Sequence, residues 1–65
     1  MDMQGFFVRV DGPELSVAYK GPYESLGSAR NEAKRLGPGL NIYHGFLKFD
    51  GISYDDKELD FIENC

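Results

Sequence analysis

The chain has little of what stabilises or identifies many small proteins. Cys65 is its only cysteine, so no disulfide can form within the chain, and a single thiol is typical of a reducing, intracellular setting. No apolar run approaches the roughly 18 residues that a membrane span needs. The first residues contain neither a basic segment nor an apolar stretch, so we expect no secretory signal and a cytoplasmic location.

Basic residues are scarce at the C-terminal end. Residues 1–48 carry five acids and six bases, whereas residues 49–65 carry six acids and only one base, Lys57. The net charge of −4 therefore comes entirely from residues 49–65. We expect no direct binding of nucleic acid, because contacts to phosphates need clustered Lys and Arg.

The length and the apolar content predict one compact domain, residues 1–65. A hydrophobic content of 42% is too high for a disordered chain. A domain of this size buries only about 60% of the surface that its unfolded chain exposes, so its core is small. Formation of a homodimer would be one way to enlarge that core.

Alternating apolar residues predict a first β-hairpin in FFVRVDGPELSVAY (residues 6–19). Turn residues at positions 11–14 separate the two alternating runs. We expect the even-numbered residues of the first strand and the odd-numbered residues of the second, Tyr19 included, to face the core. This arrangement leaves Phe7 exposed on the outer face.

Residues 25–37 have the pattern of a helix. Ser25 suits the N-cap position, and Gly37 followed by Pro38 suits the end. The apolar residues fall on one stripe at helical spacing: Leu26, Ala29, Ala33 and Leu36. Because two of the four are alanines, we expect the helix to lie close to a sheet.

A second hairpin is predicted in residues 40–54. Its first apolar pair is out of phase with its second pair, the two being Leu40 with Ile42 and Leu47 with Phe49. Gly45 lies between the pairs, so we expect a β-bulge there that resets the alternation. Asp50-Gly51 predicts the turn that follows.

Residues 55–63 fit two structures. Strict alternation of acids with other residues favours a short strand, whereas Asp55 and Glu58 together form a capping-box pattern for a short helix. In either structure Asp56 and Asp60 would share a face. The predicted fold class is therefore α+β, a β-β-α-β-β antiparallel sheet with one helix packed on one face, and the last segment is favoured as a strand over a helix.

The sequence predicts no catalytic residue, no metal site and no cofactor. Calcium loops need oxygen ligands and a glycine at fixed positions, and neither Asp50 nor Asp55 starts a register that supplies them. His44 is the only histidine, and we expect it on a strand as a surface or packing residue. Cys65 has no evident activating base.

The acidic end has two interpretations. It can be a solvated edge that keeps the last strand from pairing with other chains, or it can be a recognition surface. Same-face residues of a strand lie about 6.8 Å apart, on the scale of neighbouring phosphates of a nucleic-acid strand. Phe7 is expected to be exposed, together with Tyr43 or Phe46, depending on where the bulge falls. The expected partner-binding residues are five acids and three aromatic residues: Asp55, Asp56, Glu58, Asp60, Glu63, Phe7, Tyr43 and Phe46.

The segment GPYESLGSARNEAKRL is similar to a segment of SPOR domains, a family that binds peptidoglycan. The likeness covers about 16 residues and involves Gly21, Pro22, Tyr23, Ser25 and Ala29. A SPOR domain carries two βα units, whereas one helix is expected here. We interpret the likeness as shared strand-turn-helix chemistry.

In its size and charge profile the chain resembles small acidic phage-encoded inhibitors of host defence, including anti-CRISPR proteins that mimic DNA. The resemblance implies a non-enzymatic inhibitor. Such an inhibitor binds a protein with a basic, nucleic-acid-binding surface, for instance a CRISPR effector, and excludes DNA from it. The alternative is a small homodimeric structural or accessory interaction protein whose acids only keep it in solution.

Overall fold

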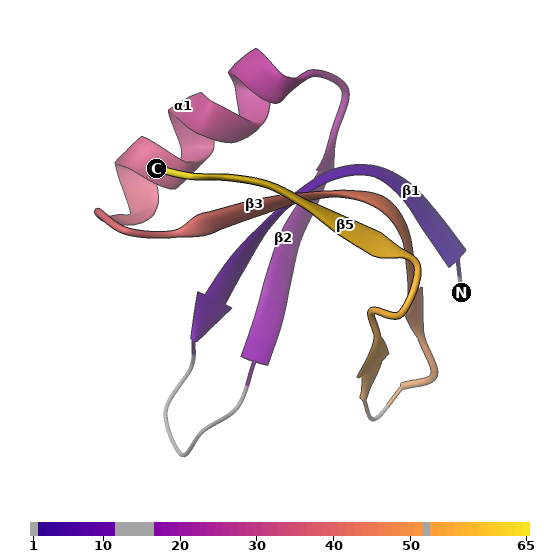
Figure 1. The fold of residues 1–65 in the computed structure, drawn as a ribbon. Coiled ribbons are helices and arrows are strands. Elements are labelled where there is room, and N and C mark those ends of the chain that lie inside the picture. The colour runs from indigo at the N-terminus through magenta and orange to yellow at the C-terminus, as the bar shows by residue number, and fades with distance from the viewer. Residues whose placement is uncertain (1, 12–16, 52) are drawn as a thin grey trace.

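The described part of the chain folds into one helix and an antiparallel sheet (Figure 1). The computed structural model describes residues 2–11, 17–51 and 53–65. The described elements are, in chain order, β1 (Asp2–Asp11), β2 (Val17–Tyr23), α1 (Leu26–Leu36), β3 (Asn41–Phe49), β4 (Tyr54–Asp55) and β5 (Leu59–Asn64). The predicted α+β class is confirmed, and the last segment is a strand, preceded by the two-residue β4. Most of the predicted turn at 11–14 lies outside the described residues.

The strands follow the order β2-β1-β3, and both β4 and β5 lie beyond β3. β1 pairs with β3 along almost the whole of its length, from Asp2↔Lys48 to Arg9↔Asn41. β4 and β5 also pair with β3, so they share its other edge one after the other. Among the described strands β5 pairs only with β3, and it therefore forms an edge of the sheet.

The helix matches its sequence prediction at both ends. Ser25 is the N-cap, and its hydroxyl oxygen accepts a hydrogen bond of 3.1 Å from the Ser28 backbone N–H. The helix ends at Leu36, and the Gly37 N–H donates to the Ala33 carbonyl. Lys34 and Arg35 lie in the last turn, where positive charge complements the helix dipole.

One core lies between α1 and the sheet. Val8 of β1 and Ile42 of β3 are fully buried against Ala29 and Ala33 of the helix. Because alanine is small, the helix backbone approaches the sheet closely. Five partly buried apolar residues surround this core: Phe6, Tyr23, Leu26, Leu40 and Cys65.

A second core lies on the opposite face of the sheet. Its buried members are Phe7, Tyr19 and Leu47, with partly buried apolar residues around them. The rings of Tyr19 on β2 and Tyr54 on β4 lie 5.5 Å apart, although β1 and β3 separate these strands in the sheet order. Neighbouring strands are about 4.8 Å apart, so a flat sheet would hold β2 and β4 much farther apart. The sheet is therefore strongly curved, and this curvature encloses the second core.

The second core corrects two sequence-based expectations. Phe7 is only 1% exposed, so its predicted place on an exposed face is wrong. Tyr19 pairs with Arg9, an odd-numbered residue of β1, so it does not share a face with the even-numbered residues. The common cause is that both faces of the sheet bury apolar side chains, whereas the prediction assumed a single buried face.

The two apolar pairs of β3 are out of phase for the same reason. Ile42 packs toward α1, whereas Leu47 packs into the second core. The expected bulge at Gly45 is absent from the pairing of β1 with β3, where Gly45 lies regularly opposite Gly5. Glycine is needed at position 45 for another reason. Its φ is +143°, and a Cβ there would collide with the carbonyl oxygen of Glu58.

Candidate functional site

The acidic end of the chain forms one edge of the sheet. We define the acidic edge as residues 54–64, which comprise β4, the turn after it and β5. All five predicted acidic site residues lie on it: Asp55, Asp56, Glu58, Asp60 and Glu63. Their surroundings differ, and these differences decide which of them could meet a partner.

The acids do not form one regular row. Lys48 pairs with Asp55, and Gly45 pairs with Leu59. The two β3 residues are three positions apart in the sequence, whereas their partners on the acidic edge are four positions apart. This extra residue lies in the turn that contains Asp56, and an odd shift turns the following side chains to the other face. Asp60 pairs with His44 in the strand register. The predicted common face of Asp56 and Asp60 is therefore wrong.

Asp56 is tied to the second core. The Tyr19 hydroxyl donates a hydrogen bond of 2.8 Å to an Asp56 carboxylate oxygen. Burial, followed by this hydrogen bond, raises the pKa of Tyr19 well above its ordinary value. Asp56 therefore holds the turn against β2, and we assign it a structural role.

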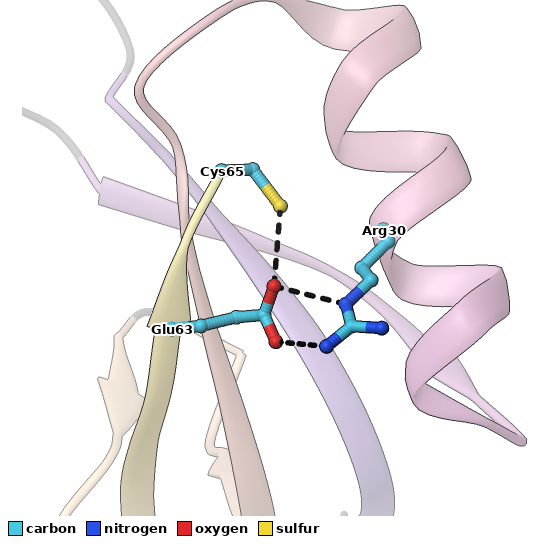
Figure 2. Close-up of polar contacts among 3 residues, drawn as sticks. All are labelled: Arg30, Glu63 and Cys65. Carbon is cyan, nitrogen blue, oxygen red and sulfur yellow. Dashed lines mark hydrogen bonds and ion pairs between the residues drawn. The ribbon is translucent and has the colours of Figure 1, made fainter.

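Glu63 is tied to the helix (Figure 2). The Arg30 Nε donates to Glu63 Oε2 at 2.9 Å, and Arg30 Nη2 donates to Oε1 at 2.6 Å. Such a two-point pair fixes the carboxylate in one orientation. Hydrogen bonds from Arg30 lower the pKa of Glu63, and Glu63 raises the pKa of Arg30. The Cys65 thiol lies 4.0 Å from the same carboxylate. Glu63 thus anchors the end of β5 to α1.

The remaining three acids are exposed, as Asp56 also is, but among the described residues none of them is bonded to a core residue or to the helix. Glu58 lies 3.5 Å from the Lys48 ammonium, and both side chains are at least half exposed, so this pair contributes little stability. Asp55 accepts a hydrogen bond of 3.2 Å from the Lys57 backbone N–H. The Asp60 side chain is exposed and has no hydrogen bond or ion pair with any residue that the structure describes. These carboxylates are the ones that could meet a partner at small cost.

The three predicted aromatic residues have different environments. Phe46 is 45% exposed, as expected for a contact residue. Tyr43 is partly buried, with its ring 6.0 Å from that of Tyr19 and 5.9 Å from that of Phe61. Phe7, as shown above, belongs to the second core. Of the predicted aromatic patch, only Phe46 therefore presents a large exposed surface.

Two apolar residues of the acidic edge were missed as site residues. Phe61 is 58% exposed and Ile62 is 39% exposed, and both lie on β5. The register shifts beside them, since Tyr43 pairs with Phe61 whereas Ile42 pairs with Glu63. Their adjacency was the available signal, because two successive strand residues cannot both face one core.

A shallow pocket of 320 Å³ lies near the start of the helix. Its lining includes Phe6, Tyr23, Glu24 and His44. The rings of Phe6 and His44 lie 4.4 Å apart, so His44 is a packing residue with an exposed side, as expected. Within residues 2–11, 17–51 and 53–65, no three His, Cys, Asp or Glu side chains gather as metal ligands. In the same part of the chain no helix is long and apolar enough to cross a membrane.

Comparisons of the chain with protein families, curated proteins and solved structures find no match. The resemblances to a SPOR segment and to anti-CRISPR inhibitors therefore stay predictions. The grounds for a function are the exposed acids and the exposed apolar side chains of the acidic edge, together with the strand that carries them.

Proposed function

We propose that the protein is a non-enzymatic inhibitor that binds a basic, nucleic-acid-binding surface of a partner protein and excludes nucleic acid from it. The observation that carries this proposal is the position of the charge. The protein's excess of acids falls in residues 49–65, and five of the six acids there lie on the acidic edge. A groove that binds phosphates attracts a surface of this sign.

The electrostatic effect of such an edge is strongest on the rate of association. Carboxylates in water act over a Debye length of about 8 Å at physiological ionic strength. Exposed charges of one sign steer an oppositely charged partner and raise the association rate, and salt weakens this effect. Binding through Asp55, Glu58 and Asp60 should therefore be sensitive to salt.

The structure modifies the form of mimicry that the sequence suggested. An even row of carboxylates at strand spacing is not present, because Asp56 and Glu63 are engaged within the protein. Their engagement holds the turn and the end of β5 in place. We propose mimicry of phosphate charge on a rigid edge, without reproduction of phosphate spacing, and a CRISPR effector stays a candidate partner on the resemblance alone.

A homodimer is the second candidate. The observation that favours it is the exposure of Phe61 and Ile62 on the open edge of the sheet, since a second copy could cover them. The same contact would bring like charges together around Asp60. Sedimentation velocity over a range of protein and salt concentrations tests it, because such a dimer would form only at high salt.

The proposed inhibition can be tested by mutual exclusion. The protein is immobilised, partners are captured from an extract of its source cells at low salt, and the captured partner is offered labelled DNA and RNA. We expect the free partner to bind nucleic acid and the captured partner not to bind it. A captured partner that still binds nucleic acid with unchanged affinity would overturn the proposal.

A further inference from the structure

The outer edge of β5 is the strongest unassigned feature of the protein. β5 runs over six residues, Leu59–Asn64, and pairs with β3 alone among the described strands. In an antiparallel sheet, alternate residues of an edge strand point their N–H and C=O groups away from the sheet. An extended chain could therefore add to β5 through backbone hydrogen bonds.

The side chains of β5 differ between its two sides. Asp60 pairs with His44, and Glu63 reaches Arg30, so these acids lie on the side of the sheet that carries α1. Phe61 contacts the ring of Tyr43 and lies toward the second core. A chain that fits this edge would present positive side chains on one side and apolar side chains on the other.

We propose that β5 binds an extended basic segment of the partner as an added strand. Lys or Arg side chains of that segment lie on the side of Asp60, and its apolar side chains lie on the side of Phe61. This inference rests on the proposed function, since it names the part of the basic partner that the acidic edge recognises. Backbone hydrogen bonds provide affinity, and the two rows of side chains provide specificity.

Charge makes a basic strand a better occupant than a second copy of the protein. Two copies paired through β5 would bring the exposed Asp60 carboxylates of both chains to one shared edge. Like charges on paired strands are destabilising, whereas opposite charges are favourable. The exposed acid of β5 thus opposes pairing between identical chains and still admits a basic strand.

Synthetic peptides can test this mode of binding. The first probe is a peptide of seven residues that alternates Lys and Val. Two matched probes carry the same charges but bear N-methyl groups on all the Lys or on all the Val residues, which removes alternate backbone donors. Dissociation constants come from NMR titration of the labelled protein, and amide hydrogen exchange locates the bound strand.

We expect the unmodified peptide to bind and to slow exchange at outward-facing amides within β5. Amides of β2, the other edge of the sheet, should be unaffected and serve as an internal control. At least one N-methylated peptide should bind about tenfold or more weakly, because it loses several backbone hydrogen bonds. Asp60→Lys should weaken binding, whereas Glu24→Lys, the same change of charge at an exposed residue outside the acidic edge, should not.

Three results would overturn strand addition. They are absence of peptide binding, equal affinity for all three peptides, and slowed exchange at β5 in a dimer that forms without peptide. If one of these results is obtained while the captured partner still excludes nucleic acid, the proposed function stands and only strand addition fails. If peptides add to β5 but the captured partner still binds nucleic acid, the proposed inhibition fails instead.

Discussion

The Tyr19 hydroxyl donates a hydrogen bond of 2.8 Å to the Asp56 carboxylate across a separation of 37 residues. This bond joins β2, at one edge of the sheet, to the turn that precedes β5 at the other edge. Together with the contact between the rings of Tyr19 and Tyr54, it fixes the curvature that encloses the second core. Asp56, which the sequence suggested as a recognition residue, thus also makes a structural contact.

Removal of the Tyr19 hydroxyl should destabilise the protein. Tyr19→Phe keeps the ring in the second core and removes only the donor, so we expect a loss of about 1–2 kcal/mol in the free energy of unfolding. Urea denaturation followed by circular dichroism measures it. Asp56→Ala should cause a similar loss, and the double variant should lose less than the sum. Strictly additive losses would show that the two groups do not interact.

Phe7 should behave as a core residue. Phe7→Ala is expected to cost about 3–5 kcal/mol, which is most of the stability of a domain of this size. Phe46→Ala is the matched control because Phe46 lies on β3 with 45% of its surface exposed, and its cost should be within about 1 kcal/mol. Thermal unfolding distinguishes the two. Equal melting temperatures would contradict the second core.

Two glycines should respond to alanine in opposite directions. Gly45→Ala should destabilise the protein by about 1–3 kcal/mol, because φ is positive there and the methyl group would meet the Glu58 carbonyl. Gly27→Ala, in the first turn of α1, should stabilise it by about 0.5–1 kcal/mol. The nearest atom to that new methyl group would be the Ser25 hydroxyl oxygen at 3.9 Å. A stable Gly45→Ala variant would contradict the close approach of the turn to β3.

Stability should fall in acid partly through Glu63. Arg30 lowers the pKa of Glu63 in the folded state below its ordinary value of 4.5, so the pair stabilises the fold above that pH. The contribution is lost as the pH falls through the lowered pKa, when Glu63 becomes protonated. Melting temperature against pH should therefore have a shallower acid limb in Glu63→Gln than in the wild type.

The matched variant for the acid limb is Arg30→Gln. It removes the cause of the lowered pKa and should flatten the same part of the curve. The Glu32–Arg35 pair is unaffected by either change, so the melting temperature of both variants should still fall to some extent in acid. An unchanged acid limb in Glu63→Gln would contradict the ion pair.

Local signals predicted much of the fold. Ser25, Gly37 and the alanine stripe determine α1 through contacts within one stretch of chain, and its ends were predicted correctly. The second core could not be predicted in the same way. Phe7 is buried because the sheet curves enough to bring Tyr19 into contact with Asp56. The alternation of apolar and polar residues along one strand does not predict a contact between residues so far apart in the sequence.

The distribution of charge in the sequence predicted where the candidate site lies, but the orientation of its side chains was predicted only in part. The acids do lie along one edge, because they are close in sequence and β4 and β5, on either side of the turn, both pair with β3. Which acids bond within the protein and which face solvent depends on one extra residue in the turn. Because of that residue, the side chains that follow it point to the opposite face of the sheet. Conversely, Phe61 and Ile62 were missed, because their exposure follows from β5 being the edge strand.

The central claim is that exposed acids of the acidic edge displace nucleic acid from the partner. Its most direct test is the concentration of protein that displaces half of a labelled DNA from the captured partner, compared among wild type, Asp60→Lys and Glu24→Lys. We predict that Asp60→Lys requires about tenfold more protein, whereas Glu24→Lys stays within about twofold of wild type. Equal displacement by Asp60→Lys and wild type would contradict the claim.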